Sequence, residues 1–250
     1  MSNPPMAKQR AYQAYRRLWE ILDWLYPPRC GGCGQCGSRW CQACHSQSTL
    51  IEQNYCPRCG QIQSQPGLCS RCTSRTPVLT GMRSWALFDG PVRNALHRLK
   101  YARDIALGEV LSRPLIQLLK QLKWEVDCVL PVPLAQARQK QRGYNQAALL
   151  AYPLALATGI KYRSKGVKKI KETRSQVGLS IHQRHENVAD AFLADPAIVK
   201  NCTVLIIDDV ATSGATMESC ASAIMIAGAN QVYGMTLAQA PAPSTPVLSL

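Results

Sequence analysis

Apolar residues recur along the chain at two spacings, and each spacing predicts a different kind of element. Between residues 6 and 26 they recur every three or four positions, as on one face of a helix, at Ala11, Tyr15, Leu18, Leu22 and Leu25. Pro27 and Pro28 follow and predict the end of this helix. We expect its apolar face to pack against the rest of the protein. A helix lying on a membrane surface is the alternative, because Arg16, Arg17 and Trp24 belong to the same segment.

From about residue 82, short apolar runs alternate with segments of helical spacing. Strands are expected near 83–88, 126–131, 203–208 and 231–237, with a weaker one near 166–170. Helices are expected near 91–101, 105–123, 144–158, 182–190 and 214–227. Strands that alternate with helices predict an α/β fold, in which helices flank a parallel sheet. The proline-rich end, residues 241–250, predicts a flexible tail.

Residues 29–76 differ from both regions, because they hold almost no aliphatic side chains. A segment with so little to bury does not fold by burial alone, so we expect a metal to hold it together. Nine of the 12 cysteines of the chain lie between residues 30 and 72, mostly as Cys-x-x-Cys pairs. The N-terminus lacks the apolar core of a signal peptide, and no apolar run approaches the roughly 18–20 residues of a membrane span. We therefore expect a cytoplasmic protein whose cysteines bind metal.

The cysteine spacing predicts two tetrahedral zinc sites. The first would use Cys30, Cys33, Cys41 and Cys44, and the second would use Cys56, Cys59, Cys69 and Cys72. Sites with four cysteine ligands and no open position are structural rather than catalytic. Cys36 leaves the register of the first site open, since Cys33 and Cys36 have the same spacing as the other pairs. A redox-active Cys-x-x-Cys is the alternative to zinc. The chain then divides into an N-terminal helix at 1–28, a double zinc knuckle at 29–76, an α/β domain at 77–240 and the tail.

The chain is basic, with a formal net charge of +14. Two zinc ions on eight thiolates would reduce this to about +10, because each tetrathiolate site carries a charge of −2. The excess is concentrated between residues 138 and 184, where eleven Lys and Arg side chains accompany a single acid, Glu172. Such a block attracts polyanions, either a pyrophosphate or a nucleic-acid backbone. A solvated basic surface is the alternative.

A phosphate-binding pattern runs from residue 203 to residue 216. An apolar run at 204–207, typical of a buried parallel strand, ends at Asp208 and Asp209, where α/β sheets bind their ligands. Small and hydroxyl residues then precede the next predicted helix: Ala211, Thr212, Ser213, Gly214, Ala215 and Thr216. A helix N-terminus with such a loop suits a phosphate, and the two carboxylates suit the vicinal hydroxyls of a ribose. The pattern predicts a ribose-5-phosphate site; a capped helix start is the alternative.

These motifs together resemble the ComF family, in which cysteine knuckles precede a type I phosphoribosyltransferase domain. The segment DDVATSGAT is similar to the signature with which such domains bind 5-phosphoribosyl-1-pyrophosphate (PRPP). The likeness extends to PPRCGGCG at 27–34, CPRCG at 56–60, HRLKYARD at 97–104, LPVPLAQARQKQRGYNQA at 130–147 and ETRSQVGLSIHQRHENVADAF at 172–192. It covers about residues 27–238, with one departure at Ala211, where a larger aliphatic residue or a tyrosine is expected.

The resemblance implies a role for each of these segments. Asp208 and Asp209 would be the catalytic acids, near a Mg²⁺ ion that binds the pyrophosphate and the ribose hydroxyls. The pyrophosphate would bind the loop at Pro131, Val132 and Pro133, with Arg138, Arg142 and Asn145 in the same segment. A lid over the site would be formed by residues 171–184, with Arg174, Gln176 and Arg184. The implied partners are PRPP, single-stranded DNA and the DNA-uptake machinery of natural competence.

Three functions follow as hypotheses. The chain is a phosphoribosyltransferase acting on an unknown acceptor, a sensor that binds PRPP without turnover, or a protein that binds single-stranded DNA during uptake. The last two are compatible with each other. Residues 76–125 offer no pattern that identifies an acceptor pocket.

Overall fold

The computed structural model describes residues 6–171 and 191–241, with the side chains described from residue 10 onward. The predicted helix at 182–190, the three lid residues named above and almost all of the predicted tail lie outside these ranges.

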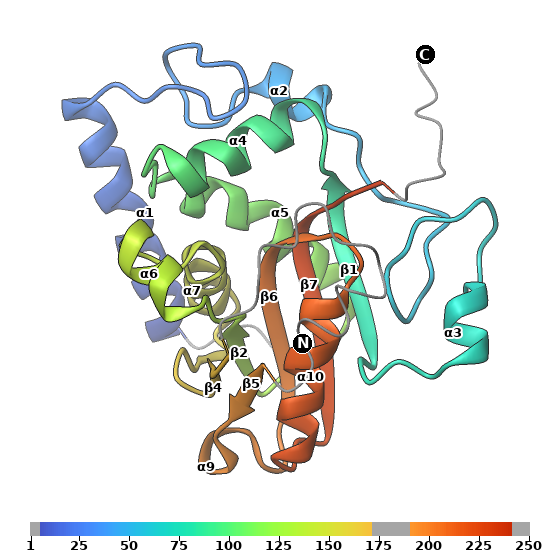
Figure 1. Cartoon of the computed structure of the whole chain (residues 1–250). Helices are drawn as coiled ribbons and strands as arrows, with labels where there is room; N and C mark the ends of the chain where they lie inside the picture. Colours follow the sequence, from blue (N-terminus) through green and yellow to red (C-terminus); the bar gives the residue numbers. More distant parts are fainter. Residues whose placement is uncertain (1–5, 172–190, 242–250) are drawn as a thin grey trace.

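A five-stranded parallel sheet forms the centre of the protein (Figure 1). Its strands are β1 (Gly81–Leu87), β7 (Gln231–Gln239), β6 (Thr203–Ala211), β2 (Cys128–Pro131) and β3 (Lys161–Tyr162), in that spatial order. Four of them match the predicted strands. The weaker prediction near 166–170 is β4 (Val167–Lys169), which pairs antiparallel with β5 (Phe192–Ala194) in a separate two-stranded sheet. The parallel sheet with flanking helices confirms the predicted α/β architecture.

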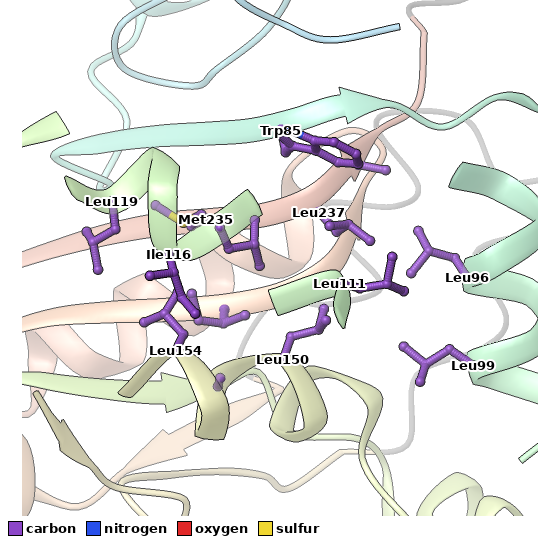
Figure 2. Packing of buried hydrophobic residues seen from close by; sticks show 14 of the residues in the cluster. Trp85, Leu96, Leu99, Leu111, Ile116, Leu119, Leu150, Leu154, Met235 and Leu237 are labelled. Atoms are coloured by element: carbon purple, nitrogen blue, oxygen red, sulfur yellow. The ribbon is translucent and has the colours of Figure 1, made fainter. Parts of the chain in front are cut away.

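Helices cover both faces of this sheet. One face carries α4 (Gly90–Tyr101), α5 (Leu107–Leu122) and α7 (Gln146–Thr158), and the other carries α10 (Ala215–Ile226). The alternation of side chains along a strand explains the division. Leu205 and Ile207 of β6 pack into the first core, and Val204 and Ile206 pack into the second. Figure 2 shows the first core, in which leucines of α4, α5 and α7 meet Met235 and Leu237 of β7.

The remaining helices are short, apart from the first. α6 (Gln136–Arg142) and α9 (Pro196–Val199) connect strands and helices of the α/β part, while α2 (Gln42–Ser46) and α3 (Ser70–Ser74) belong to the cysteine-rich region. α1 (Met6–Leu25) packs against α7, where the rings of Tyr15 and Tyr152 meet edge to face at 5.8 Å. The predicted apolar face is only partly covered, however: Tyr15 and Leu22 are half-buried, whereas Ala11, Leu18 and Leu25 are exposed. In the part of the chain that is described, no helix is both long enough and apolar enough to cross a membrane.

The cysteine-rich region contains two clusters, each made of four sulfur atoms within 4.8 Å of one another: Cys30, Cys33, Cys41 and Cys44 in the first, and Cys56, Cys59, Cys69 and Cys72 in the second. Cys36 lies outside both, which resolves the register of the first cluster. The two turns have the same backbone. Gly34 and Gly60 have positive φ angles of 80° and 70°, and their amides donate to the carbonyl oxygens of Cys30 and Cys56 at 2.9 Å. We call these modules the first and the second ribbon.

Each cluster fits a tetrahedral Zn²⁺ ion. Four thiolates provide the complete ligand set of a structural zinc site, and amides of Cys41 and Cys69 already point at the sulfur atoms of Cys30 and Cys56, 3.4 Å away. The second cluster is also the whole buried core of its ribbon. Without the metal the ribbons have no apolar interior to hold them folded.

The purified protein is therefore expected to contain two zinc ions per chain by elemental analysis. Changing Cys44 to Ser removes one ion, because a tetrahedral site with three ligands binds zinc far more weakly. Cys36→Ser is the matched control and keeps both ions. Fewer than one ion in the unmodified protein, or loss of an ion from the Cys36 variant, would contradict this assignment.

Candidate functional site

The site lies where the direction of the chain through the sheet reverses. From β6 the chain passes through α10 to β7, toward one edge, and from β2 it passes through α7 to β3, toward the other. β2 and β6 are neighbours, so the two connections diverge between them, which is where open α/β sheets bind ligands. β2 ends at Pro131, opposite Ile207, while β6 continues to Ala211 alongside β7. The last four residues of β6 therefore have no strand beside them on the β2 side.

A cavity of about 740 Å³ fills this position. It is lined by the end of β6 and the start of α10, the loop after β2, α6 and the C-terminal end of α4, together with Phe88, Arg103, Gln146 of α7 and Lys169 of β4. Of the residues predicted from the sequence, it brings together Val132, Pro133, Arg138, Arg142, Asp208, Asp209, Ala211, Thr212, Gly214, Ala215 and Thr216. Two other predicted residues, Pro131 and Ser213, are sequence neighbours of lining residues but do not line the cavity themselves. Arg174 and Arg184 lie outside the described residues.

The acidic pair differs in one respect from the prediction. The predicted strand at 203–208 ends at Asp208, but β6 also includes Asp209, because β7 extends to Gln239 and pairs with β6 as far as Ala211. Successive side chains of a strand point to opposite faces, so the two carboxylates have different neighbours. The Asp209 side chain is 5% exposed and lies on the face of α4 and α7. Asp208 is partly open to the cavity, and its Oδ1 accepts a hydrogen bond of 2.9 Å from the Asp209 amide.

Lys100 of α4 neutralises one of these acids. Its Nζ lies 2.5 Å from Asp209 Oδ2, and Gln146 Nε2 of α7 donates to Asp209 Oδ1 at 3.2 Å. Burial opposes the ionisation of Asp209, but the Lys100 ammonium outweighs it and lowers the pKa of Asp209. Burial likewise opposes the charge on Lys100, and Asp209 outweighs it and raises the pKa of Lys100. Both groups are therefore charged at neutral pH.

Within the described residues, Asp208 forms no such ion pair, and the Lys100 charge acts on it more weakly than burial and the charge of Asp209 do. Burial raises the pKa of Asp208 well above its ordinary value, and the negative charge of Asp209 adds to this rise. An ionised Asp208 is thus costly until a cation or a hydroxyl donor reaches it. The arrangement presents one unneutralised acidic group to the cavity.

The loop after β6 has the backbone of an anion site. Gly214 stands just before α10 with a φ angle of 77°, a left-handed conformation that glycine adopts at no steric cost. The 12-residue helix that follows directs its first amides and the positive end of its dipole to the cavity. Thr212 and Thr216 line the same wall and add hydroxyl donors. This part of the site suits a phosphate.

The opposite wall is basic. Arg138 and Arg142 come from α6, and the Arg142 guanidinium lies over the ring of Tyr101, 5.6 Å from its centre. Asn145 holds the preceding loop, since its Nδ2 donates to the Val132 carbonyl oxygen at 2.9 Å. Planar guanidinium groups suit the paired oxygens of a diphosphate. Phosphate donors, an acidic pair and arginines therefore surround one volume.

Sequence reasoning missed two residues that contact the acids, Lys100 and Gln146. Lys100 is in the HRLKYARD segment and Gln146 is in the RGYNQA segment, and the sequence marks both segments only through their resemblance to the ComF family. Neither the type of these residues nor their spacing in the sequence predicts a contact with Asp209, because that contact depends on how α4 and α7 pack on the sheet.

The comparisons with known proteins agree with this architecture. Residues 21–73 match the double zinc ribbon domain family, and residues 116–248 match the phosphoribosyl transferase domain family. The DNA utilization protein YhgH of Salmonella typhimurium is 30% identical over 203 residues, which cover 78% of this chain and 88% of that protein. Competence protein F of Haemophilus influenzae is 30% identical over 211 residues, covering 80% and 90%. Competence protein ComFC of Bacillus subtilis is 26% identical over 208 residues, covering 79% and 82%.

A double zinc ribbon, a phosphoribosyl transferase domain and relatives that share both across most of their length place this chain in the ComF family.

Proposed function

We propose that this chain binds PRPP together with Mg²⁺ in the cavity between β6, β2 and α6. The observation that carries the proposal is that a single cavity is lined by the loop at 211–216, by Asp208 and Asp209, and by Arg138 and Arg142 of α6. PRPP has three groups that suit these three parts: a 5-phosphate, two ribose hydroxyls and a pyrophosphate. The 5-phosphate would bind at 211–216, the hydroxyls at the acidic pair, and the pyrophosphate at 131–133 with Arg138 and Arg142.

The reaction that such a site would support is displacement at the anomeric carbon. A nitrogen nucleophile forms a bond to that carbon, the bond to the pyrophosphate oxygen breaks, and pyrophosphate leaves with the electron pair. The residues present would act by positioning and by charge, since the acids lie where positive charge develops on the sugar. Mg²⁺ would neutralise charge on the departing pyrophosphate. A sensor that binds PRPP without turnover is the alternative, and it would use the same contacts.

A second function, binding of single-stranded DNA, is favoured by a separate observation. The side chains of Lys140, Lys165 and Lys168 are exposed, and they belong to α6 and the β3–β4 region beside the cavity. Relatives of this chain are named for DNA utilization and competence. We propose that the chain acts in DNA uptake and that this basic surface contacts the phosphate backbone.

Calorimetry with Mg²⁺ and PRPP tests the first proposal. The unmodified protein should bind, and a variant with both Asp208→Asn and Asp209→Asn should lose about 100-fold in affinity, because two charge-assisted contacts to the ribose hydroxyls disappear. Glu125→Gln, an exposed change far from the cavity, is the control and should bind normally. Absence of binding by the unmodified protein, or equal binding by the double variant, would exclude the proposed site.

The two acids should have opposite effects on the stability of the ligand-free protein at pH 7. Folding raises the pKa of Asp208, so the protonated carboxyl is favoured in the folded protein. Asp208 therefore stabilises the folded protein below its unfolded-state pKa, and this stabilisation is lost as the pH rises through its folded-state pKa. Asp208→Asn should therefore raise the free energy of unfolding by about 1 kcal/mol. The pKa of Asp209 is lowered, so its contribution exists above the unfolded pKa and is lost as the pH falls through the folded pKa. Asp209→Asn should lower the free energy of unfolding by about 3 kcal/mol, because it leaves the Lys100 ammonium buried without a partner.

Urea denaturation of both single variants measures this difference. Adding Lys100→Met to the Asp209 variant should recover part of the loss, since the unpaired buried charge is then removed. Equal destabilisation by the two single changes would show that the charges are not arranged as described.

The DNA proposal is tested by the salt dependence of binding to a single-stranded oligonucleotide. Neutralising Lys140 and Lys168 to Gln should weaken binding and reduce the slope of log affinity against log salt by about 0.7 for each lysine that contacts a phosphate. The matched control neutralises Lys120 and Lys123, which are exposed elsewhere on the protein. If both pairs of changes have the same effect, the basic surface is not the binding site.

A further inference from the structure

The second ribbon contacts the phosphate loop directly. Arg71 belongs to α3, between the zinc-site residues Cys69 and Cys72, and its Nη1 donates to the Ser213 carbonyl oxygen at 3.0 Å. The two residues are 142 positions apart in the sequence. The other terminal nitrogen of Arg71 lies 4.0 Å from the place that a Cβ atom on Gly214 would occupy. The guanidinium therefore lies against the outer side of the loop.

This contact has a consequence for the direction of the backbone dipoles in the loop. A loop that presents its amides to an anion must turn its carbonyl oxygens away, because an inward carbonyl repels the anion. The Ser213 carbonyl belongs to the peptide bond whose amide is that of Gly214. A donor on the outer side holds this peptide in the orientation that directs the Gly214 amide away from the ribbon. Arg71 is that donor.

The position of Arg71 is itself fixed by the ribbon. Its guanidinium lies beside the Cys59 side chain, and it is half buried between the cysteine cluster and the loop. The linker from this ribbon to β1 is held at the same place, because the Val78 amide donates to Glu218 Oε2 in the first turn of α10 at 3.0 Å. The second ribbon is thus joined to the N-terminus of α10 by two hydrogen bonds. Figure 1 shows α3 and its flanking loops beside β1.

We propose that Arg71 is a positioning residue for phosphate recognition, and that the second ribbon is a structural part of the PRPP site. The inference rests on the proposed function, because it concerns the loop that would bind the 5-phosphate. It adds a role for the second ribbon in that function. This role follows from the contact between Arg71 and Ser213 and not from the sequence of the loop.

Two small ligands separate the effect on the loop from an effect on the whole site. Ribose 5-phosphate would occupy the loop and the acidic pair, whereas pyrophosphate with Mg²⁺ would occupy the arginine side. Arg71→Gln should weaken ribose 5-phosphate about tenfold or more, since a hydrogen bond from a charged donor is lost, and should leave pyrophosphate affinity unchanged. A general loss of folding would lower both affinities. Only variant preparations that contain two zinc ions per chain and unfold at the same midpoint as the unmodified protein should be compared, because these are correctly folded.

Two further variants distinguish positioning from simple charge. Arg71→Lys keeps the positive charge but cannot contact both the Cys59 side chain and the Ser213 carbonyl, so it should lose most of the affinity that Arg71→Gln loses. Arg75→Gln removes an exposed positive charge that also acts on Glu218, and it should bind ribose 5-phosphate normally.

The outcomes are separable from those of the proposed function. If the unmodified protein binds neither ribose 5-phosphate nor pyrophosphate, the proposed function is wrong. If it binds ribose 5-phosphate and Arg71→Gln or Arg71→Lys binds it equally well, only the role of Arg71 is wrong. An equal loss in Arg71→Gln and Arg75→Gln would also overturn that role, because the effect would then be one of general charge.

Discussion

The ion pair between Lys100 and Asp209 is the interaction on which the rest of the site depends. Two adjacent carboxylates at the buried end of a strand lose hydration and repel each other, so one of them needs a cation. Lys100 supplies it at 2.5 Å, and its charge keeps Asp209 ionised while Asp208 faces the cavity. This requires α4 to lie at a fixed distance from β6. The core in Figure 2 sets that distance, because Leu96 and Leu99 of α4 pack into the same cluster as Leu205 and Ile207.

The ribbons complete this arrangement from outside the sheet. The first ribbon lies on α4, where Arg98 and Asn94 donate to the carbonyl oxygens of Cys30 and Gly32 at 3.2 and 3.0 Å. Close approach is possible only because Gly31 lacks a side chain, since a Cβ there would lie 2.8 Å from Leu107. The second ribbon lies on β1 and on the start of α10. Metal binding in each ribbon is therefore linked mechanically to a different wall of the cavity, one through the helix of Lys100 and one through the phosphate loop.

The sequence predicted what depends on local pattern and left out what depends on packing. The apolar run at 204–207 followed by two acids and a hydroxyl loop is a local signal; the run forms part of the buried core, and both acids and most of the loop line one cavity. The cysteine spacing likewise indicated both clusters. Lys100 and Arg71 carry no such signal, because each is one cation among 29 and acquires its partner only when distant elements meet. The length of β6 was underestimated for the same reason, since its last residues are strand only through pairing with β7.

The distribution of charge around the cavity also indicates which kinds of ligand fit it. Lys100 is occupied by Asp209, so it contributes little net charge toward a ligand. The other charged groups that line the cavity within the described residues are the dipole end of α10, Asp208, and the cations Arg103, Arg138, Arg142 and Lys169. A continuous triphosphate would bring negative charge against Asp208 and would be repelled there. A ligand with anionic ends and a neutral, hydroxyl-bearing centre meets a complementary group at each position. On electrostatic grounds, this distribution favours a ligand whose anionic groups are separated over one that is negatively charged along its whole length.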